Sequence, residues 1–207
     1  KILHPLMIGG RYFVKREGFM SEEKNTKKKD FKKGDKLVRF GRVYEIYKVS
    51  NEEDPETGEK ERYIHFQPVY ETQANRSLVC AIPISNIDKT NIRQPMSEEE
   101  VDELLEMMME MVEDPTKRFN TRQAKEVLKS NDPRKIALIL KRLAVVRRDP
   151  DTNFTYTKKR IFRKGMKRLQ EEIALVKKME LEETSQMLRD LLKKQAVKSL
   201  PLDEEED

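Results

Sequence analysis

The 207-residue chain has no tryptophan, one cysteine, two histidines and seven glycines. A single cysteine excludes an intrachain disulfide, and Cys80, which lies in an apolar segment, is typical of a small core side chain in a reducing cytoplasm. No apolar run approaches the roughly 20 residues that a membrane-spanning helix needs. Residues 1–20 also lack the continuous apolar core of a signal peptide. We therefore expect a soluble, unsecreted protein.

Patterns of catalytic and metal-binding residues are equally scarce. The sequence contains no Cys-x-x-Cys, no His-Glu-x-x-His and no glycine-rich phosphate loop. His65 has no second histidine nearby, which favours a satisfied strand histidine over a metal ligand or a catalytic base. Three glutamates at 98–100 precede an apolar helical pattern. At the start of a helix they complement the helix dipole, and this interpretation is favoured over a general acid/base pair. We predict no catalytic residue, no metal site and no cofactor, and hence no enzyme.

Charge is what the chain has in abundance, with 43 Lys and Arg against 38 Asp and Glu and a net charge of +5. The positive excess lies in the second half, where residues 117–178 hold 20 Lys and Arg against six Asp and Glu. Such a density is typical of a surface that binds a polyanion, and it is equally compatible with a solvated helical face. Composition leaves both interpretations open.

The sequence pattern changes near Pro95, which indicates two domains. Residues 1–30 are expected to be a disordered leader or an upstream extension, with Met20 as the alternative start, because residues 20–30 have no apolar periodicity. Residues 31–93 contain short apolar or alternating runs separated by Gly, Pro and Asp turns, at 37–40, 42–49, 62–67 and 77–82. Four or five short strands of this kind predict a small Tudor-like or SH3-like β-barrel.

Residues 97–194 predict a compact domain of about five helices. Ser97 to Glu100 forms a Ser-x-x-Glu capping box before an apolar pattern in which methionines 107–109 and 111 are read as core rather than as a partner groove. Further helices are expected at 121–129, from Pro133 with Asp132 as N-cap, at 157–178 and at 182–194. Residues 195–207 end in an acidic run and are predicted to be a disordered tail. The predicted fold class is α+β.

Several short motifs in this order resemble the CarD-like family of bacterial transcription regulators, over about residues 31–192. These motifs are Phe31-Lys32-Lys33-Gly34-Asp35-Lys36-Leu37-Val38, the strand 78–83 that ends in proline, Ser97-Glu98-Glu99-Glu100-Val101, Leu128-Lys129-Ser130-Asn131-Asp132, Arg147-Arg148-Asp149 and Lys159-Arg160-Ile161-Phe162. The resemblance implies a Tudor-like module at 31–93 that binds the β subunit of RNA polymerase. It also implies a helical module at 97–194 that binds double-stranded promoter DNA at the upstream edge of the melted region. Such a protein would stabilise the open complex without reading sequence, and we expect it in the cytoplasm, associated with the nucleoid.

The resemblance also assigns residues to these two surfaces. The expected DNA-binding residues are Lys117, Arg118, Phe119, Arg122, Arg147, Arg148, Lys159, Arg160 and Arg163. The family's tryptophan wedge is missing; its position falls at Lys117, beside which Phe119 is either a replacement wedge or a core side chain. The family's polymerase-binding arginines are not retained in register. The residues expected to supply positive charge to the polymerase-binding surface are Arg42, Lys48, Arg62 and Arg76.

Two other functions fit the same layout. Small barrels with basic helices also occur in RNA-associated and ribosome-associated proteins, so fold alone does not separate them from a polymerase-binding factor. A protein–protein scaffold whose charge is only solvating is the third alternative. The partner that copurifies with the chain separates the first two, and salt-dependent binding of nucleic acid separates both from the third.

Overall fold

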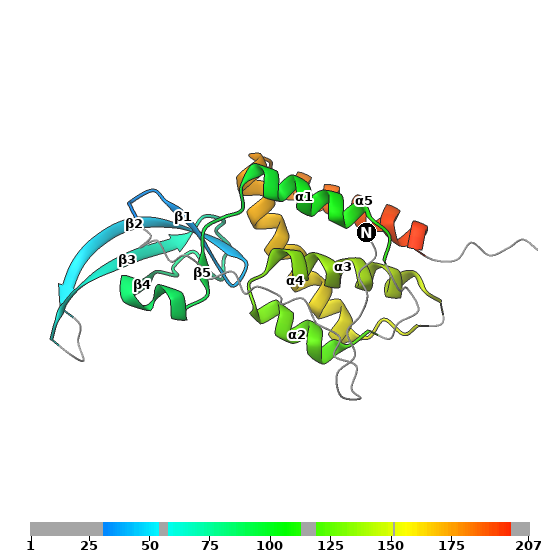
Figure 1. The fold of residues 1–207 in the computed structure, drawn as a ribbon, viewed down its shortest axis with the longest axis horizontal. Coiled ribbons are helices and arrows are strands. Elements are labelled where there is room, and N and C mark those ends of the chain that lie inside the picture. Colours follow the sequence, from blue (N-terminus) through cyan, green and yellow to red (C-terminus); the bar gives the residue numbers. More distant parts are fainter. Residues whose placement is uncertain (1–30, 54–57, 113–118, 151, 200–207) are drawn as a thin grey trace, which may run out of the picture. The chain divides into compact units, whose positions relative to one another are not determined.

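A computed structural model of the chain describes residues 31–53, 58–112, 119–150 and 152–199, with side chains up to Lys194 in the last helix. The expected leader at 1–30 and residues 200–207 of the acidic tail lie outside the described residues. Within them a small antiparallel sheet comes first and five α-helices follow (Figure 1), which confirms the predicted α+β class. Two separate hydrophobic clusters form, one in the sheet and one among the helices.

The sheet has five strands in the order β4-β3-β2-β1-β5, and it curls into a half-barrel. The strands are β1 (Lys36–Arg39), β2 (Arg42–Glu53), β3 (Lys60–Pro68), β4 (Cys80–Pro83) and β5 (Ile92–Arg93). All four strand pairings are antiparallel, and the β2–β3 pairing is interrupted by a bulge between Ile46 and Lys48. The order leaves β4 and β5 as the two edge strands among the described residues.

The β1–β2 turn determines how closely the sheet approaches the helices. Phe40 and Gly41 both have positive φ, 51° and 69°, as a two-residue turn between right-twisted strands requires. A Cβ atom on Gly41 would lie 2.5 Å from the Arg168 side chain of the fourth helix. Only glycine therefore fits at this position, because any side chain would collide with a neighbouring helix.

The structure differs from the strand predictions around residues 77–93. The nearly continuous apolar run predicted a strand over 77–82, but the strand begins at Cys80, and Leu78 and Val79 are exposed before it. A 3₁₀-helix, η1 (Ile84–Lys89), and the short strand β5 follow and were not predicted. Two residues of β5 are too few to show a period of two, so pattern reasoning has no signal there.

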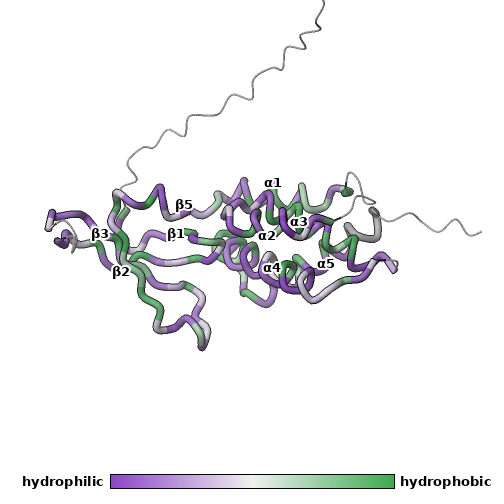
Figure 2. Tube along the Cα trace, turned by 90° about the horizontal axis from the view of Figure 1, so that it is seen from below, coloured by the Kyte–Doolittle hydropathy of each residue, from purple (hydrophilic) through white to green (hydrophobic). Residues whose placement is uncertain are grey.

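The helices are α1 (Glu98–Met109), α2 (Thr121–Lys129), α3 (Pro133–Arg148), α4 (Tyr156–Lys177) and α5 (Leu181–Ser199). The predicted caps are present: Ser97 and Glu100 form the reciprocal capping box of α1, and Asp132 caps α3 ahead of Pro133. Helix α5 continues five residues beyond its predicted end at Lys194. Figure 2 shows hydrophilic and hydrophobic stretches alternating along these helices, as expected of amphipathic helices that share one core.

The helical core joins all five helices. Its fully buried side chains include Leu104 of α1, Leu140 and Leu143 of α3, Ile173 of α4 and Leu188 of α5. Each apolar side chain of this size contributes about 1.5–3 kcal/mol when buried. This cluster fixes the outward faces of α3 and α4, which carry most of the basic residues.

Candidate nucleic-acid interface

Helix α4 presents a row of cations to solvent. We call Lys159, Arg160, Arg163, Lys164 and Lys167 the cationic row; all five side chains are exposed. Among the described residues, none of them forms an ion pair. Arg147 and Arg148, in the last turn of α3, are likewise exposed and form no ion pair within the described part of the chain. The seven side chains therefore keep their positive charge available to a partner.

The packing of α4 on α3 holds the cationic row in place. Buried Ile161, Leu169 and Ile173 turn one face of α4 toward the helical core. Gly165 lets the two helices approach closely, because a Cβ atom there would lie 3.0 Å from Leu140. The residues at 159, 163 and 167 follow at four-residue intervals, so they form one stripe on the helix.

The start of α4 adds to the positive potential. Thr155 caps the helix through a bond from the Lys158 backbone N–H, and no acidic residue lies in the first turn. The N-terminal end of a helix dipole is positive, and acidic residues usually compensate it. Here Lys159 and Arg160 lie close to that end instead. The local field therefore favours an anion.

A cavity of about 360 Å³ opens beside the cationic row. The residues that line it are Arg147, Phe154, Lys159, Phe162, Arg163, Met166, Lys167, Gln170, Ser185 and Arg189. Five of these ten residues are Lys or Arg, and none is Asp or Glu. The cavity brings together Arg147, Lys159 and Arg163, three of the predicted DNA-binding residues, from two helices.

Arg122 and Phe119 were also predicted to bind DNA, and neither of them lines the cavity. Arg122 is exposed on α2, and no residue of that helix lines the cavity. Lys117 and Arg118 lie outside the described residues. Phe119 is partly buried and packs against the helical core. The side chain therefore has a core contact and some exposed surface, and the assignment of Phe119 as a wedge stays a prediction.

The four residues predicted to bind polymerase differ in their contacts. Arg42 bonds to Glu171 of α4, with its Nε atom 2.6 and 2.8 Å from the two carboxylate oxygens. Lys48 is exposed and pairs with Glu52 at 3.2 Å. Arg62 donates to the Phe31 carbonyl at 3.3 Å, and Arg76 is exposed in the turn before β4. Three of the four thus face solvent from the sheet, whereas Arg42 already has a partner in the helices.

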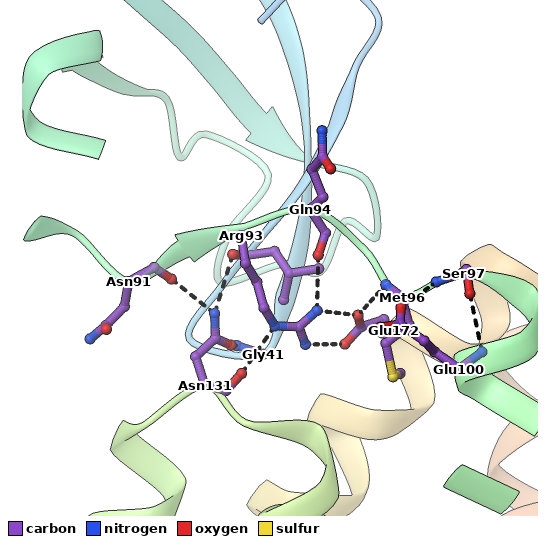
Figure 3. A network of polar contacts seen from close by, with 10 residues as sticks. Gly41, Asn91, Arg93, Gln94, Met96, Ser97, Glu100, Asn131 and Glu172 are labelled. Atoms are coloured by element: carbon purple, nitrogen blue, oxygen red, sulfur yellow. Dashed lines mark hydrogen bonds and ion pairs between the residues drawn. The ribbon is translucent and has the colours of Figure 1, made fainter. Parts of the chain in front are cut away.

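A buried polar network connects the sheet to the helices (Figure 3). The guanidinium of Arg93, on β5, donates two bonds of 2.5 Å to the carboxylate of Glu172, whose side chain is fully buried in α4. Glu172 also accepts the Met96 backbone N–H at 2.9 Å. Such bidentate, charge-assisted pairs fix orientation as well as contributing energy.

Asn131 is the second centre of this network. Its side chain accepts the Gly41 N–H at 2.6 Å and donates to the carbonyls of Val38 and Asn91 at 3.3 and 2.8 Å. Its own carbonyl accepts a bond from Arg93 at 3.0 Å. Asn131 has φ of 59°, which asparagine tolerates better than most residues. This single residue, in the turn before α3, therefore bonds to three segments of the sheet.

Burial changes the ionisation of the groups around the Arg42–Glu171 pair. Desolvation raises the pKa of Glu171 above its ordinary value, although Arg42 beside it acts in the opposite direction. Burial also lowers the pKa of Arg168, with a smaller contribution from the charge of Arg42. These groups lie on the sheet-facing side of α4. They are structural contacts, and the charge of Lys167, from the cationic row, also acts to lower the pKa of Glu171.

Among the described residues of the sheet, His65, Ser50 and Glu52 lie close together but not in the arrangement of a catalytic triad. One ring nitrogen, Nε2, lies 2.9 Å from both the Ser50 hydroxyl and the Glu52 carboxylate. A triad needs the serine on one nitrogen and the acid on the other. In the described residues no group of three or more His, Cys, Asp and Glu side chains could hold a metal ion.

Sequence reasoning missed seven of the ten residues that line the cavity and all of the network. The uncharged lining residues and Arg189 come from α4, α5 and the loop before α4, which only the fold brings together. A signal for the network was present: in the sequence of the long helix, Glu171 and Glu172 stand between two apolar residues, Leu169 and Ile173. Two adjacent acids in such a place indicate buried partners.

Comparisons with known proteins point to one family. Residues 100–189 match the family model described as the C-terminal domain of CarD. The match runs from the first turn of α1 to about the middle of α5, and so it includes the cationic row and every residue that lines the cavity. No curated protein matches the chain. Among the described residues, no helix is both long and apolar enough to cross a membrane.

Proposed function

Because residues 100–189 match the C-terminal domain of CarD, we propose that the chain is a CarD-like, non-enzymatic transcription factor that binds RNA polymerase and promoter DNA. The helical domain, residues 97–194, contacts duplex DNA near the upstream edge of the melted region and stabilises the open complex. The sheet domain, residues 31–93, binds the polymerase β subunit. The row of unpaired cations on α4, together with the end of α3, carries the proposal.

The chemistry of the cationic row suits phosphates rather than bases. Lys and Arg side chains neutralise phosphates and release counterions, which gives affinity without sequence preference. Base reading needs Asn, Gln or Arg side chains aimed at base edges from an element that enters a groove. The exposed face of α4 carries charge and few amides, so sequence-independent binding is expected.

Salt titration of DNA binding tests the helical surface. Binding of a labelled duplex to the full chain should weaken by about 10³-fold between about 50 and 200 mM salt, as for several phosphate contacts. The double variant Lys159→Glu, Arg160→Glu should weaken binding at least roughly tenfold and flatten the salt dependence. Lys33→Glu is the control, because Lys33 is an exposed cation of the sheet. Equal losses in the double variant and the control would contradict the assignment.

The free edge of β4 supports the proposed polymerase contact. An edge strand offers unpaired N–H and C=O groups, and a partner strand can add to it through main-chain hydrogen bonds. Leu78 and Val79, just before β4, are 43% and 58% exposed, and Ala81 on the strand is also exposed. An apolar, uncharged edge of this kind is normally covered by a partner. Binding through the main chain would not require the missing family arginines.

A pull-down with purified β subunit tests this edge. Val79→Lys should abolish or strongly reduce capture, because it adds a charge where an apolar contact forms. Met111→Lys is the matched control: Met111 is 59% exposed but lies after α1, in the helical domain. Capture unaffected by Val79→Lys would reject the β4 edge. Recovery of ribosomal components in place of polymerase from the native host would favour the RNA-associated alternative.

A further inference from the structure

The cavity beside the cationic row combines two kinds of surface. Its polar rim is cationic, from Arg147 at the end of α3, three members of the cationic row, and Arg189 of α5. Its remaining lining is largely apolar and aromatic, with Phe154 and Phe162 as the rings. A site for phosphate alone would need only the charges. An apolar floor beneath them calls for a ligand with a flat, uncharged part as well.

We propose that this cavity receives one unpaired nucleotide of single-stranded DNA; the proposal rests on the DNA-binding function proposed above. The base lies against the aromatic side chains, and the flanking phosphates contact the cations. Positively charged grooves lined by aromatic side chains are the usual way in which proteins bind single strands without sequence preference. The volume of about 360 Å³ lies in the range of small-ligand pockets.

Two polar side chains suit a base in particular. Gln170 carries one donor group and one acceptor, so it can bond to the edge of any base. Its amide nitrogen already donates one N–H to the Leu181 carbonyl at 2.6 Å, which leaves the second N–H as a donor and the oxygen as an acceptor. Ser185 of α5 is 4% exposed and supplies a hydroxyl to the same lining. Neither group adds negative charge, so the lining stays compatible with a polyanion.

The surroundings of the cavity favour a strand over a free nucleotide. The cavity uses Lys159, Arg163 and Lys167, and the same row continues outside it to Arg160 and Lys164. Cations beyond the rim can contact the phosphates of neighbouring nucleotides, which a free nucleotide does not have. Within the described part of the chain, the one acid paired to the rim is Glu182, 3.5 Å from Arg189, and both side chains are more than half exposed. An exposed pair of this length competes weakly with phosphate.

The test compares two DNA probes with the full-length protein at one salt concentration. The first is a duplex, and the second is the same duplex with a short unpaired stretch in one strand. Stacking of one base on an aromatic side chain strengthens binding by roughly 5- to 100-fold, so the second probe should bind at least fivefold more tightly. A 2-aminopurine in the unpaired stretch should also change its fluorescence on binding.

Phenylalanine variants locate the effect. Phe154→Leu and Phe162→Leu keep apolar volume but remove the ring, so the preference for the unpaired probe should fall to less than twofold. Tyr156→Leu is the matched control, because Tyr156 is 74% exposed, begins α4 and does not line the cavity. Thermal unfolding of each variant checks that it is folded. A preference that survives both phenylalanine changes would overturn the proposal.

The remaining outcomes separate this inference from the proposed function. Equal affinity for the two probes, with salt-dependent binding of both, overturns the cavity proposal and leaves duplex binding intact. Absence of binding to either probe overturns the DNA-binding function itself. Competition by a free mononucleotide, at concentrations where equal inorganic phosphate does not compete, would assign the cavity to a small ligand and overturn the assignment to a strand.

Discussion

Phe119 touches the helical core with only part of its surface, so its truncation should cost less stability than that of a buried ring. Complete burial of a phenylalanine makes Phe→Ala cost about 3–5 kcal/mol. We expect Phe119→Ala to lower the free energy of unfolding by less than this, measured by chemical denaturation. If Phe119 is also the wedge that replaces tryptophan, the variant should shorten the lifetime of the open promoter complex.

Among the charged residues of α4, Glu172 is the one whose replacement should destabilise the fold most. Glu172→Ala leaves the Arg93 guanidinium without its carboxylate and the Met96 N–H without its acceptor. Breaking a buried ion pair from one side costs about 3–5 kcal/mol. Glu171→Ala should cost less, since burial already raises the pKa of Glu171 and disfavours its charge. Urea unfolding of the two variants gives the comparison; a larger loss at Glu171 would contradict it.

Glu52 should make the stability of the sheet depend on pH. A hydrogen bond from Ser50, followed in importance by Lys48, lowers the pKa of Glu52 to about 2 in the folded chain. A pKa below the unfolded value stabilises the fold above that unfolded value, about 4.3 for glutamate. The stabilisation is lost as pH falls toward the folded value. The stability difference between the wild type and Glu52→Gln should therefore be constant above about pH 5 and shrink below it.

At the scale of elements, most helices could be predicted from sequence and part of the sheet could not. The capping box at Ser97 and the Asp132–Pro133 start are local signals, and both are present in the structure. Strand β5 has two residues, and it forms because β1 lies beside it. Leu78 and Val79 are likewise exposed because the strand order places β4, which they precede, at an edge of the sheet. A local sequence pattern indicates the periodicity of a segment, but it does not indicate which strand will lie beside that segment.

The candidate site divides in the same way. The basic residues of the cationic row could be found from sequence, because charge is visible in composition and spacing. The aromatic lining could not, since Phe162 on α4 reads as one more apolar residue of the buried face. The cavity joins Phe162 to Phe154 from the preceding loop and to Arg189 from α5. Only the packing of α4 and α5 brings these residues together.

The β1–β2 turn provides a prediction about how the elements fit. Gly41→Ala adds a methyl group at positive φ that would lie 2.5 Å from Arg168. Gly58→Ala is the matched control, because Gly58 has φ of 70° and no atom within 4 Å of the added Cβ. Backbone strain of about 1 kcal/mol applies to both, and the collision applies only to Gly41. Thermal unfolding should show a clearly larger loss for Gly41→Ala; equal losses would contradict the close approach.

For the molecule as a whole, two hydrophobic clusters are joined by a polar connection. The sheet cluster and the helical cluster share no residue. Hydrogen bonds from Arg42, Arg93 and Asn131 connect them instead. Hydrogen bonds are directional, whereas apolar contacts allow sliding, so a connection of this kind fixes one relative orientation. We propose that the two domains, 31–93 and 97–194, act through this connection as one body.

The Arg93–Glu172 connection has a genetic consequence. Substitutions in the cationic row should weaken the proposed DNA binding alone, and substitutions at the β4 edge should weaken the proposed polymerase binding alone. Substitutions at Arg93, Asn131 or Glu172 should impair both interactions, because these three residues hold the two proposed binding surfaces in register and belong to neither surface. A screen that scores both interactions should therefore recover suppressors of Arg93 alleles on α4, a helix 63 to 84 positions further along the chain.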